Sequence, residues 1–240
     1  MISVLMLGKK FEAVIAISVL FGLTFFLLSL VSTPAGGEDG DWLRTALIIV
    51  SSTSNDTLEE QKALSFHDHL IGQGYSNDSI IFLADEELPG SDGRSNCSNI
   101  ESSFDLISQV QDPDGEVVIM ISDHEQGVRG NSSFVFEDGV IPSSTIGSWM
   151  DDIECSSMTV ILNGNRSGLA FWELSSSTRE LISSMRWDQV NHPDQFNMTR
   201  GLEDPSADID GNGIVSYHEA YLKECYNLRF SDQDPQYFSG

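Results

Sequence analysis

The sequence predicts an α/β fold, a three-layer α/β/α sandwich built around a mainly parallel sheet. Short apolar runs of strand length alternate along the chain with segments of helical periodicity. The runs are apolar throughout, which is typical of strands buried on both faces. Strands of this kind that alternate with helices indicate a parallel sheet covered on both sides.

The first part of the sheet is predicted from two apolar runs and the helix between them. ALIIV (46–50) is expected to be a buried strand, and Thr57-x-x-Glu60 predicts a capping box that starts the next helix. SIIFL (79–83) is the second strand. The helix between them is expected to bury the apolar residues at helical spacing, Ala63, Phe66 and Leu70.

The second part continues the alternation. Ser98 is predicted to cap a helix with its apolar side chains inward, and EVVIMIS (116–122) is the third strand. SFVFEDG (133–139) is expected to form one arm of a hairpin. A short helix near 144–153 then leads to MTVILN (158–163), the fourth main strand.

The N-terminus carries a predicted membrane anchor or signal peptide. Residues 13–31 hold no charge and have about the length of a membrane span, and Lys9 and Lys10 precede them. By the positive-inside tendency residues 1–12 stay cytoplasmic. Cleavage as a signal peptide is the open alternative, which would make the protein secreted. In both cases the chain beyond the linker 32–42 is expected to lie outside the cytoplasm.

The net charge of the chain limits the classes of molecule that it is expected to bind. The chain has 12 Lys and Arg against 37 Asp and Glu, a formal net charge of −25. Phosphate binding needs clustered basic residues, so this charge argues against a nucleic-acid partner.

Sequons and cysteines are consistent with export. The three cysteines leave room for one disulfide and one free thiol, but they do not make a disulfide scaffold. A glycoprotein is expected from the six Asn-x-Ser/Thr sequons, which start at Asn55, Asn77, Asn96, Asn131, Asn165 and Asn197.

Polar residues follow two of the predicted strands where each strand ends. The third strand runs into Ser122-Asp123-His124-Glu125, and the fourth runs into the segment 163–168, Asn-Gly-Asn-Arg-Ser-Gly. Catalytic and binding groups gather beyond the carboxyl ends of strands in open α/β sheets. The sequence therefore predicts a functional site at this edge.

These segments resemble a known family. VVIMISDHEQG is similar to the strand-then-histidine segment of the legumain-type cysteine peptidases, in which the family has Ser-Asp-His-Gly. VILNGNRSG is similar to the family's strand followed by Ala-Cys-x-Ser-Gly. The resemblance covers roughly residues 44 to 237 and implies a caspase-like fold. The family includes asparaginyl endopeptidases and the catalytic subunit of the GPI-anchor transamidase.

The resemblance also implies roles for three residues. His124 matches the catalytic histidine, Asn165 stands where the family has its nucleophilic cysteine, and Glu125 replaces the glycine whose N–H helps to hold the oxyanion. A neutral amide is no nucleophile, and a carboxylate near the oxyanion would repel negative charge. We therefore expect a pseudoenzyme that binds a peptide or protein partner, for example an active relative. An active cysteine-type endopeptidase or transamidase that uses His124 is the alternative, and a calcium-stabilised surface protein without a peptide cleft is the second alternative.

A second motif lies near the C-terminus. ADIDGNGIVSYHEA (207–220) resembles an EF-hand calcium loop, with a glycine at the sixth position. The expected calcium ligands are the side chains of Asp208, Asp210, Asn212, Ser216 and Glu219 and the carbonyl of Ile214. An acidic turn that merely caps the helix 217–228 is the alternative. We expect a structural Ca²⁺ site in residues 205–240, after a legumain/caspase-like domain at 43–204.

Overall fold

The computed structural model describes residues 42–51, 57–189 and 195–240, which fall within one compact unit, Asp41–Gly240. The predicted anchor or signal peptide, 13–31, lies outside the described residues and stays a prediction. Within the described part of the chain, no helix combines the length and the apolar character that crossing a membrane requires.

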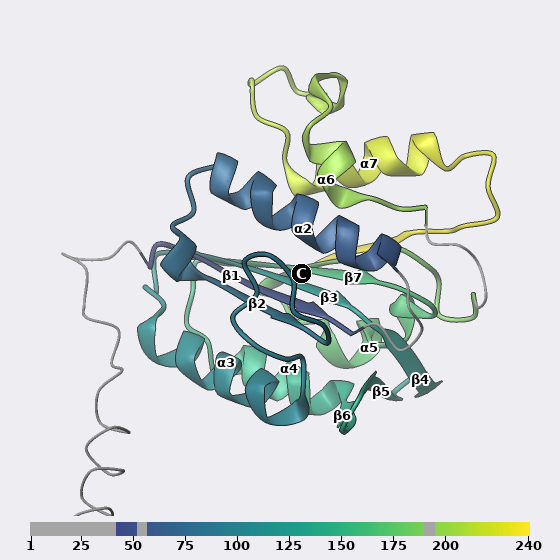
Figure 1. The fold of residues 1–240 in the computed structure, drawn as a ribbon. Helices are drawn as coiled ribbons and strands as arrows, with labels where there is room; N and C mark the ends of the chain where they lie inside the picture. Colours follow the sequence, from purple (N-terminus) through teal and green to yellow (C-terminus); the bar gives the residue numbers. More distant parts are fainter. Residues whose placement is uncertain (1–41, 52–56, 190–194) are drawn as a thin grey trace, which may run out of the picture. The chain divides into compact units, whose positions relative to one another are not determined.

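A six-stranded sheet forms the middle layer, in the order β2-β1-β3-β7-β8-β9 (Figure 1). Only β9 runs antiparallel to its neighbour. The four predicted strands are confirmed as β1, β2, β3 and β7. The strands of this sheet are β1 (Arg44–Val50), β2 (Ile80–Ala84), β3 (Glu116–Ser122), β7 (Ser157–Asn163), β8 (Arg179–Ser183) and β9 (Gln236–Ser239).

Helices cover both faces of the sheet, which confirms the predicted three-layer sandwich (Figure 1). One face carries α2 (Thr57–Gly72), α6 (Met198–Leu202) and α7 (Tyr217–Asn227). The other carries α3 (Cys97–Val110), α4 (Ser143–Asp151) and α5 (Phe171–Leu174). The described part of the chain also has three short 3-10 turns, η1 (Asn77–Ser79), η2 (Ser167–Leu169) and η3 (Pro205–Ala207).

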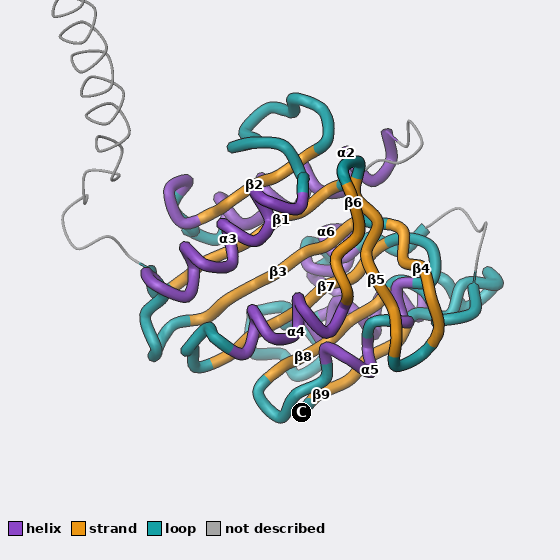
Figure 2. The backbone as a smooth tube through the Cα atoms, turned by 90° about the horizontal axis from the view of Figure 1, so that it is seen from below, coloured by secondary structure: helices purple, strands orange, loops and turns teal. Residues whose placement is uncertain are grey.

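A small antiparallel sheet lies against the face that carries α3, α4 and α5 (Figure 2). It contains β4 (His124–Val128), β5 (Asn131–Phe136) and β6 (Gly139–Pro142), and β5 confirms the predicted hairpin arm. The Asp123 carboxylate joins it to the main sheet, because one oxygen accepts from the His124 N–H (2.6 Å) and the other from the Val135 N–H (2.7 Å).

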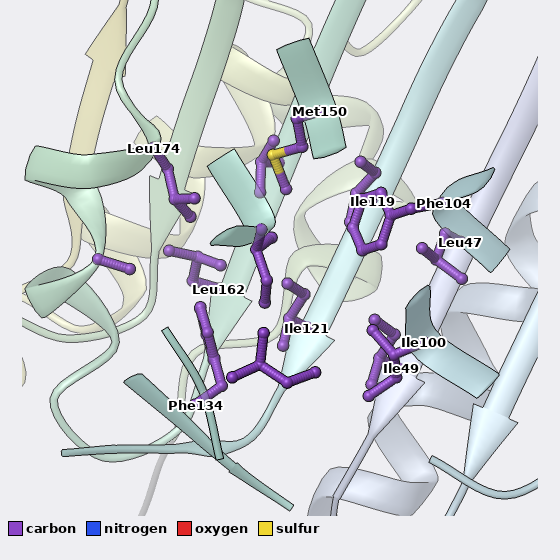
Figure 3. Close-up of a cluster of buried hydrophobic side chains, with 14 of the residues drawn as sticks. Leu47, Ile49, Ile100, Phe104, Ile119, Ile121, Phe134, Met150, Leu162 and Leu174 are labelled. Atoms are coloured by element: carbon purple, nitrogen blue, oxygen red, sulfur yellow. The ribbon is translucent and has the colours of Figure 1, made fainter. Parts of the chain in front are cut away.

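The core follows from the alternation of side chains along each strand. In β1, Leu47 and Ile49 point to one face, while Ala46, Ile48 and Val50 point to the other. On the first face, Figure 3 shows the β1 side chains packed with residues of β3, β7 and the covering helices. Full burial of each large apolar side chain stabilises the fold by roughly 1.5–3 kcal/mol.

The start of α3 differs from the prediction. Asn96 is its N-cap, and the Asn96 side chain accepts from the Asn99 N–H at 2.8 Å. The predicted cap at Ser98 is therefore wrong by two residues. Asn is as favourable as Ser at an N-cap, so the local sequence offered two competing starts.

Candidate functional site

The two polar segments predicted to meet do so at the carboxyl edge of the sheet. β3 and β7 are neighbours, with Ser122 paired with Asn163. Beyond the strands, the Asp123 N–H donates to the Asn163 carbonyl (3.2 Å) and the Glu125 N–H donates to the Asn165 carbonyl (3.4 Å). The backbone thereby holds His124, between these two donors, beside the turn that carries Asn165.

The turn after β7 has an unusual backbone. Gly164 has φ +111°, and a Cβ atom there would lie 2.2 Å from the Asp123 carbonyl oxygen. The backbone of Arg166 is in the left-handed region at φ 64°, which residues other than glycine rarely adopt. Its guanidinium supports it by donating to the carbonyls of Gly127 (2.9 Å) and Trp187 (3.3 Å). This turn packs directly against β4.

Asn165 is half-buried at the position where the resemblance implies a nucleophile. Its side-chain Oδ1 is buried and has no hydrogen-bond partner among the described residues. An amide cannot supply the thiolate or activated hydroxyl that covalent catalysis needs.

Ser167, the hydroxyl nearest to Asn165 in the sequence, is enclosed by the protein. Ser167 is only 1% exposed, and its Oγ accepts from the Met185 N–H at 3.1 Å and hydrogen bonds with Ser184 Oγ at 3.2 Å. A hydroxyl enclosed in this way cannot reach a substrate. The same burial leaves the sequon that begins at Asn165 with an inaccessible serine.

The three cysteines are all unpaired and half-buried. Cys97 begins α3, and burial together with the Asp138 carboxylate raises the pKa of its thiol. Cys155 precedes β7 at the other edge of the sheet, and burial raises its thiol pKa, as it does for Cys225 on α7. Catalytic cysteines need the opposite shift, because the thiolate is the nucleophile.

His124 is exposed as the first residue of β4, opposite Val135 of β5. Its ring makes no hydrogen bond or ion pair with any residue that the structure describes. The imidazole is therefore free to contact a bound molecule, but no described carboxylate orients it.

Glu125 points into the protein. The side chain is 1% exposed, and its Oε2 accepts from the Ala170 N–H at 2.9 Å. Burial raises the pKa of this carboxyl well above its ordinary range, although the hydrogen bond from Ala170 acts against the shift. The Glu125 N–H is occupied by the Asn165 carbonyl. The carboxyl therefore locks the η2–α5 segment to β4 and does not face the surface.

The buried carboxyl predicts a pH-dependent stability. Burial raises the pKa of Glu125 above the ordinary value of 4.5. At a pH between the unfolded and the folded pKa, the carboxyl is therefore protonated in the folded state and ionised in the unfolded chain. Its stabilising contribution is present below the unfolded pKa and is lost as pH rises through the folded pKa. Glu125→Gln stays neutral at every pH, so it should be as stable as the parent at about pH 4. Between the unfolded and the folded pKa of Glu125, it should become more stable than the parent by up to about 1.4 kcal/mol per pH unit.

Urea unfolding at several pH values, from about 4 upward, tests this expectation. Glu101→Gln, an exposed change on α3, is the matched control and should leave the pH profile unchanged. A stability difference between Glu125→Gln and the parent that does not change with pH would contradict it.

The second motif forms a tight acidic loop before α7. Carboxylate oxygens of Asp208, Asp210 and Glu219 all lie within 4.8 Å of one another. The Asp208 carboxylate accepts the N–H groups of Gly211, Asn212 and Gly213 at 2.8–3.1 Å, which wraps the loop around it.

The end of the loop is also the start of α7. Ser216 and Glu219 form a capping box, and the Ser216 N–H and hydroxyl donate to the Glu219 carboxylate and lower its pKa to about 2. The Asn212 Oδ1 accepts from the Ile214 N–H at 2.7 Å. Three charged carboxylates with further oxygen atoms fit a hard divalent cation. The capping box also fits the alternative, an acidic turn that only caps the helix.

Comparisons with known proteins agree with this fold. No protein family and no curated protein sequence matches the chain. Among solved structures, the Drosophila initiator caspase Dronc matches with a TM-score of 0.51 at 13% identity, over 82% of this chain and 79% of Dronc. Protein GSU0716 from Geobacter sulfurreducens matches with a TM-score of 0.50 at 12% identity, over 81% and 92%. At this identity the likeness shows the fold alone, and that fold is caspase-like.

Proposed function

We propose that this chain is a catalytically inactive relative of the legumain-type peptidases that uses its former catalytic edge to hold a peptide segment. The observation that carries the proposal is that an exposed His124 lies beside the turn that carries Asn165, at the carboxyl edge of a caspase-like sheet. The geometry of a peptidase edge is retained there, but the group that would attack the substrate is an amide.

The buried neighbours favour binding over catalysis. Ser167 is enclosed by hydrogen bonds, and the thiol pKa values of the cysteines are raised. Without a nucleophile, the exposed groups at this edge can recognise a peptide but cannot form an acyl intermediate. The apolar segment 13–31 and the sequons support a location outside the cytoplasm, as a membrane-anchored or secreted protein.

Peptide retention tests the binding role. The full-length chain, purified in detergent and immobilised, should retain a subset of a mixed peptide library. His124→Ala should weaken binding of the retained peptides about tenfold, or about 1.4 kcal/mol, because the ring lies exposed at the edge. Glu101→Ala on α3 is the control and should bind like the parent. Failure to retain any peptide would favour a surface protein without a peptide cleft.

The proposal includes a structural calcium site in the loop before α7. Asp208, Asp210, Asn212, Ser216 and Glu219 would supply side-chain oxygens, and Ile214 its carbonyl. A bound cation would neutralise the clustered carboxylates and hold the loop against the start of α7.

Calcium should therefore stabilise the fold. With a Kd of order 10⁻⁴ to 10⁻³ M, about 10 mM Ca²⁺ adds roughly 1.4–2.7 kcal/mol to the free energy of unfolding. Asp210→Asn should abolish this gain with little change in EDTA, because the Asp210 carboxylate accepts only local hydrogen bonds from Asn212. Thermal unfolding in EDTA and in Ca²⁺ measures both. A parent melting temperature that does not respond to Ca²⁺ would leave the loop as a helix cap.

A further inference from the structure

A cavity of about 610 Å³ lies at the amino-terminal edge of the sheet, opposite the candidate site. Its floor is formed by residues near the starts of β1, β3, β7 and β8, and its walls by the end of α2 and by the loop segment 213–218. Small-molecule sites in proteins typically measure about 300–1,000 Å³. The cavity is therefore large enough for a small organic ligand.

The floor carries two carboxylates, Glu116 on β3 and Glu180 on β8, and β7 lies between these two strands. Register places Glu116 of β3 beside Arg44 of β1, and Glu180 of β8 beside Thr159 of β7. Arg44 is committed, because its Nε pairs with Glu116 at 3.1 Å and its Nη1 donates to the Gln73 carbonyl at 2.9 Å. His218 also lines the cavity, and its ring stacks on that of Tyr237 with the centroids 4.5 Å apart, but it forms no ion pair with Glu180.

Glu180 is half-buried and faces this cavity. Its Oε2 accepts from the Thr159 hydroxyl at 3.1 Å, and its carboxylate also hydrogen bonds with Tyr237. It forms no ion pair with any residue that the structure describes. The carboxylate is therefore hydrogen-bonded, but no counter-ion offsets its charge.

Aromatic residues line the same cavity. Tyr75 and Tyr217 both contribute, and the Tyr75 hydroxyl donates to Glu116 at 3.1 Å. The faces of aromatic rings attract cations, and the Arg44 guanidinium already lies over the Tyr75 ring, 5.7 Å from its centroid. Glu203 adds a third carboxylate to the lining. His69 lies next to Glu203, and burial lowers the pKa of the His69 ring, which keeps it neutral at neutral pH. The lining thus has three carboxylates, one guanidinium, two histidine rings and two tyrosine rings.

We infer that this cavity is a binding site for an organic cation, a primary ammonium or guanidinium group on an apolar chain such as a diamine or the side chain of lysine or arginine. The ammonium pairs with Glu180 and the apolar chain packs along the tyrosine rings. The site lies at the opposite edge of the sheet from His124 and Asn165, so it does not depend on the peptide-binding role.

Calorimetry on the full-length chain tests the inference with two probes of equal length, 1,5-diaminopentane and the neutral 1,5-pentanediol. Titrations are made in EDTA and physiological salt, so that the result does not depend on calcium and diffuse attraction to the acidic surface is screened. The diamine should bind at one saturable site and the diol should not. Glu180→Gln should weaken the diamine at least tenfold, and Glu101→Gln on α3 should not.

A second variant protects the test against a folding defect in Glu180→Gln. Ser157 is exposed on the cavity floor, and Ser157→Lys would place an ammonium group inside the cavity without disturbing the core. It should abolish diamine binding while the protein unfolds at the parent temperature. Equal binding of diamine and diol, no saturable binding, or an affinity unchanged in a folded Glu180→Gln or Ser157→Lys variant would overturn the inference.

Discussion

Gly164→Ala is expected to lower the free energy of unfolding by roughly 2–5 kcal/mol, the sum of positive-φ backbone strain of roughly 1–2 kcal/mol and overpacking of roughly 1–3 kcal/mol. The added Cβ would lie 2.2 Å from the Asp123 carbonyl oxygen and 3.1 Å from its carbon. That carbonyl cannot easily retreat, because the Asp123 N–H is bonded to Asn163 and its carboxylate to β5.

Gly74→Ala is the matched control. Gly74 also has a positive φ, +92°, but nothing lies within 4 Å of its Cβ position. Only the backbone strain of a positive φ then applies, so this variant should lose about 1–2 kcal/mol of its free energy of unfolding. Urea unfolding of both variants and the parent measures the difference. Equal losses would contradict the close approach of the β7 turn to Asp123.

Most of the sheet could be predicted because its central strands are apolar on both faces. ALIIV (46–50) and EVVIMIS (116–122) cannot be solvated on either side, so their burial follows from sequence. β8 begins with Arg179 and Glu180, and β9 is only four residues long, so neither shows such a run. β9 follows an irregular segment and pairs antiparallel with β8, a choice that tertiary packing decides.

The small sheet was predicted only in part for a similar reason. β4, HEQGV, is mostly exposed and carries a glycine, which gives it no strand signal. Its conformation comes from pairing with β5 and from the Asp123 carboxylate that bonds the Val135 N–H. Such support comes from residues that are apart in sequence.

The features of the site likewise differ in whether the sequence could predict them. The closeness of His124 and Asn165 was predictable, because parallel neighbouring strands end at one edge. The burial of Glu125 was not, since its partner is the Ala170 N–H, 45 residues away. The acidic loop was visible in sequence because its oxygen-bearing residues lie within twelve consecutive positions, Asp208 to Glu219. The amino-edge cavity has no such pattern, because strands and loops far apart in the chain build it.

Asn165→Cys is expected to give this chain peptidase activity. The thiol would stand at the end of β7 beside His124, which could act as its base. Without a nucleophile the native chain should show only background hydrolysis, whereas the variant should exceed it by at least about 10²-fold, the lower range for a positioned general base. His124→Ala in the Asn165→Cys background should remove most of that gain.

Hydrolysis of a mixed fluorogenic peptide library by the full-length native chain and by Asn165→Cys, each with and without Ca²⁺, tests the central claim most directly. We predict an inert native protein and a variant that cleaves in a His124-dependent way. Cleavage by the native protein that His124→Ala abolishes would contradict the claim, because another nucleophile would then be at work. An inert Asn165→Cys variant that still folds would show that the edge no longer has the geometry of a peptidase.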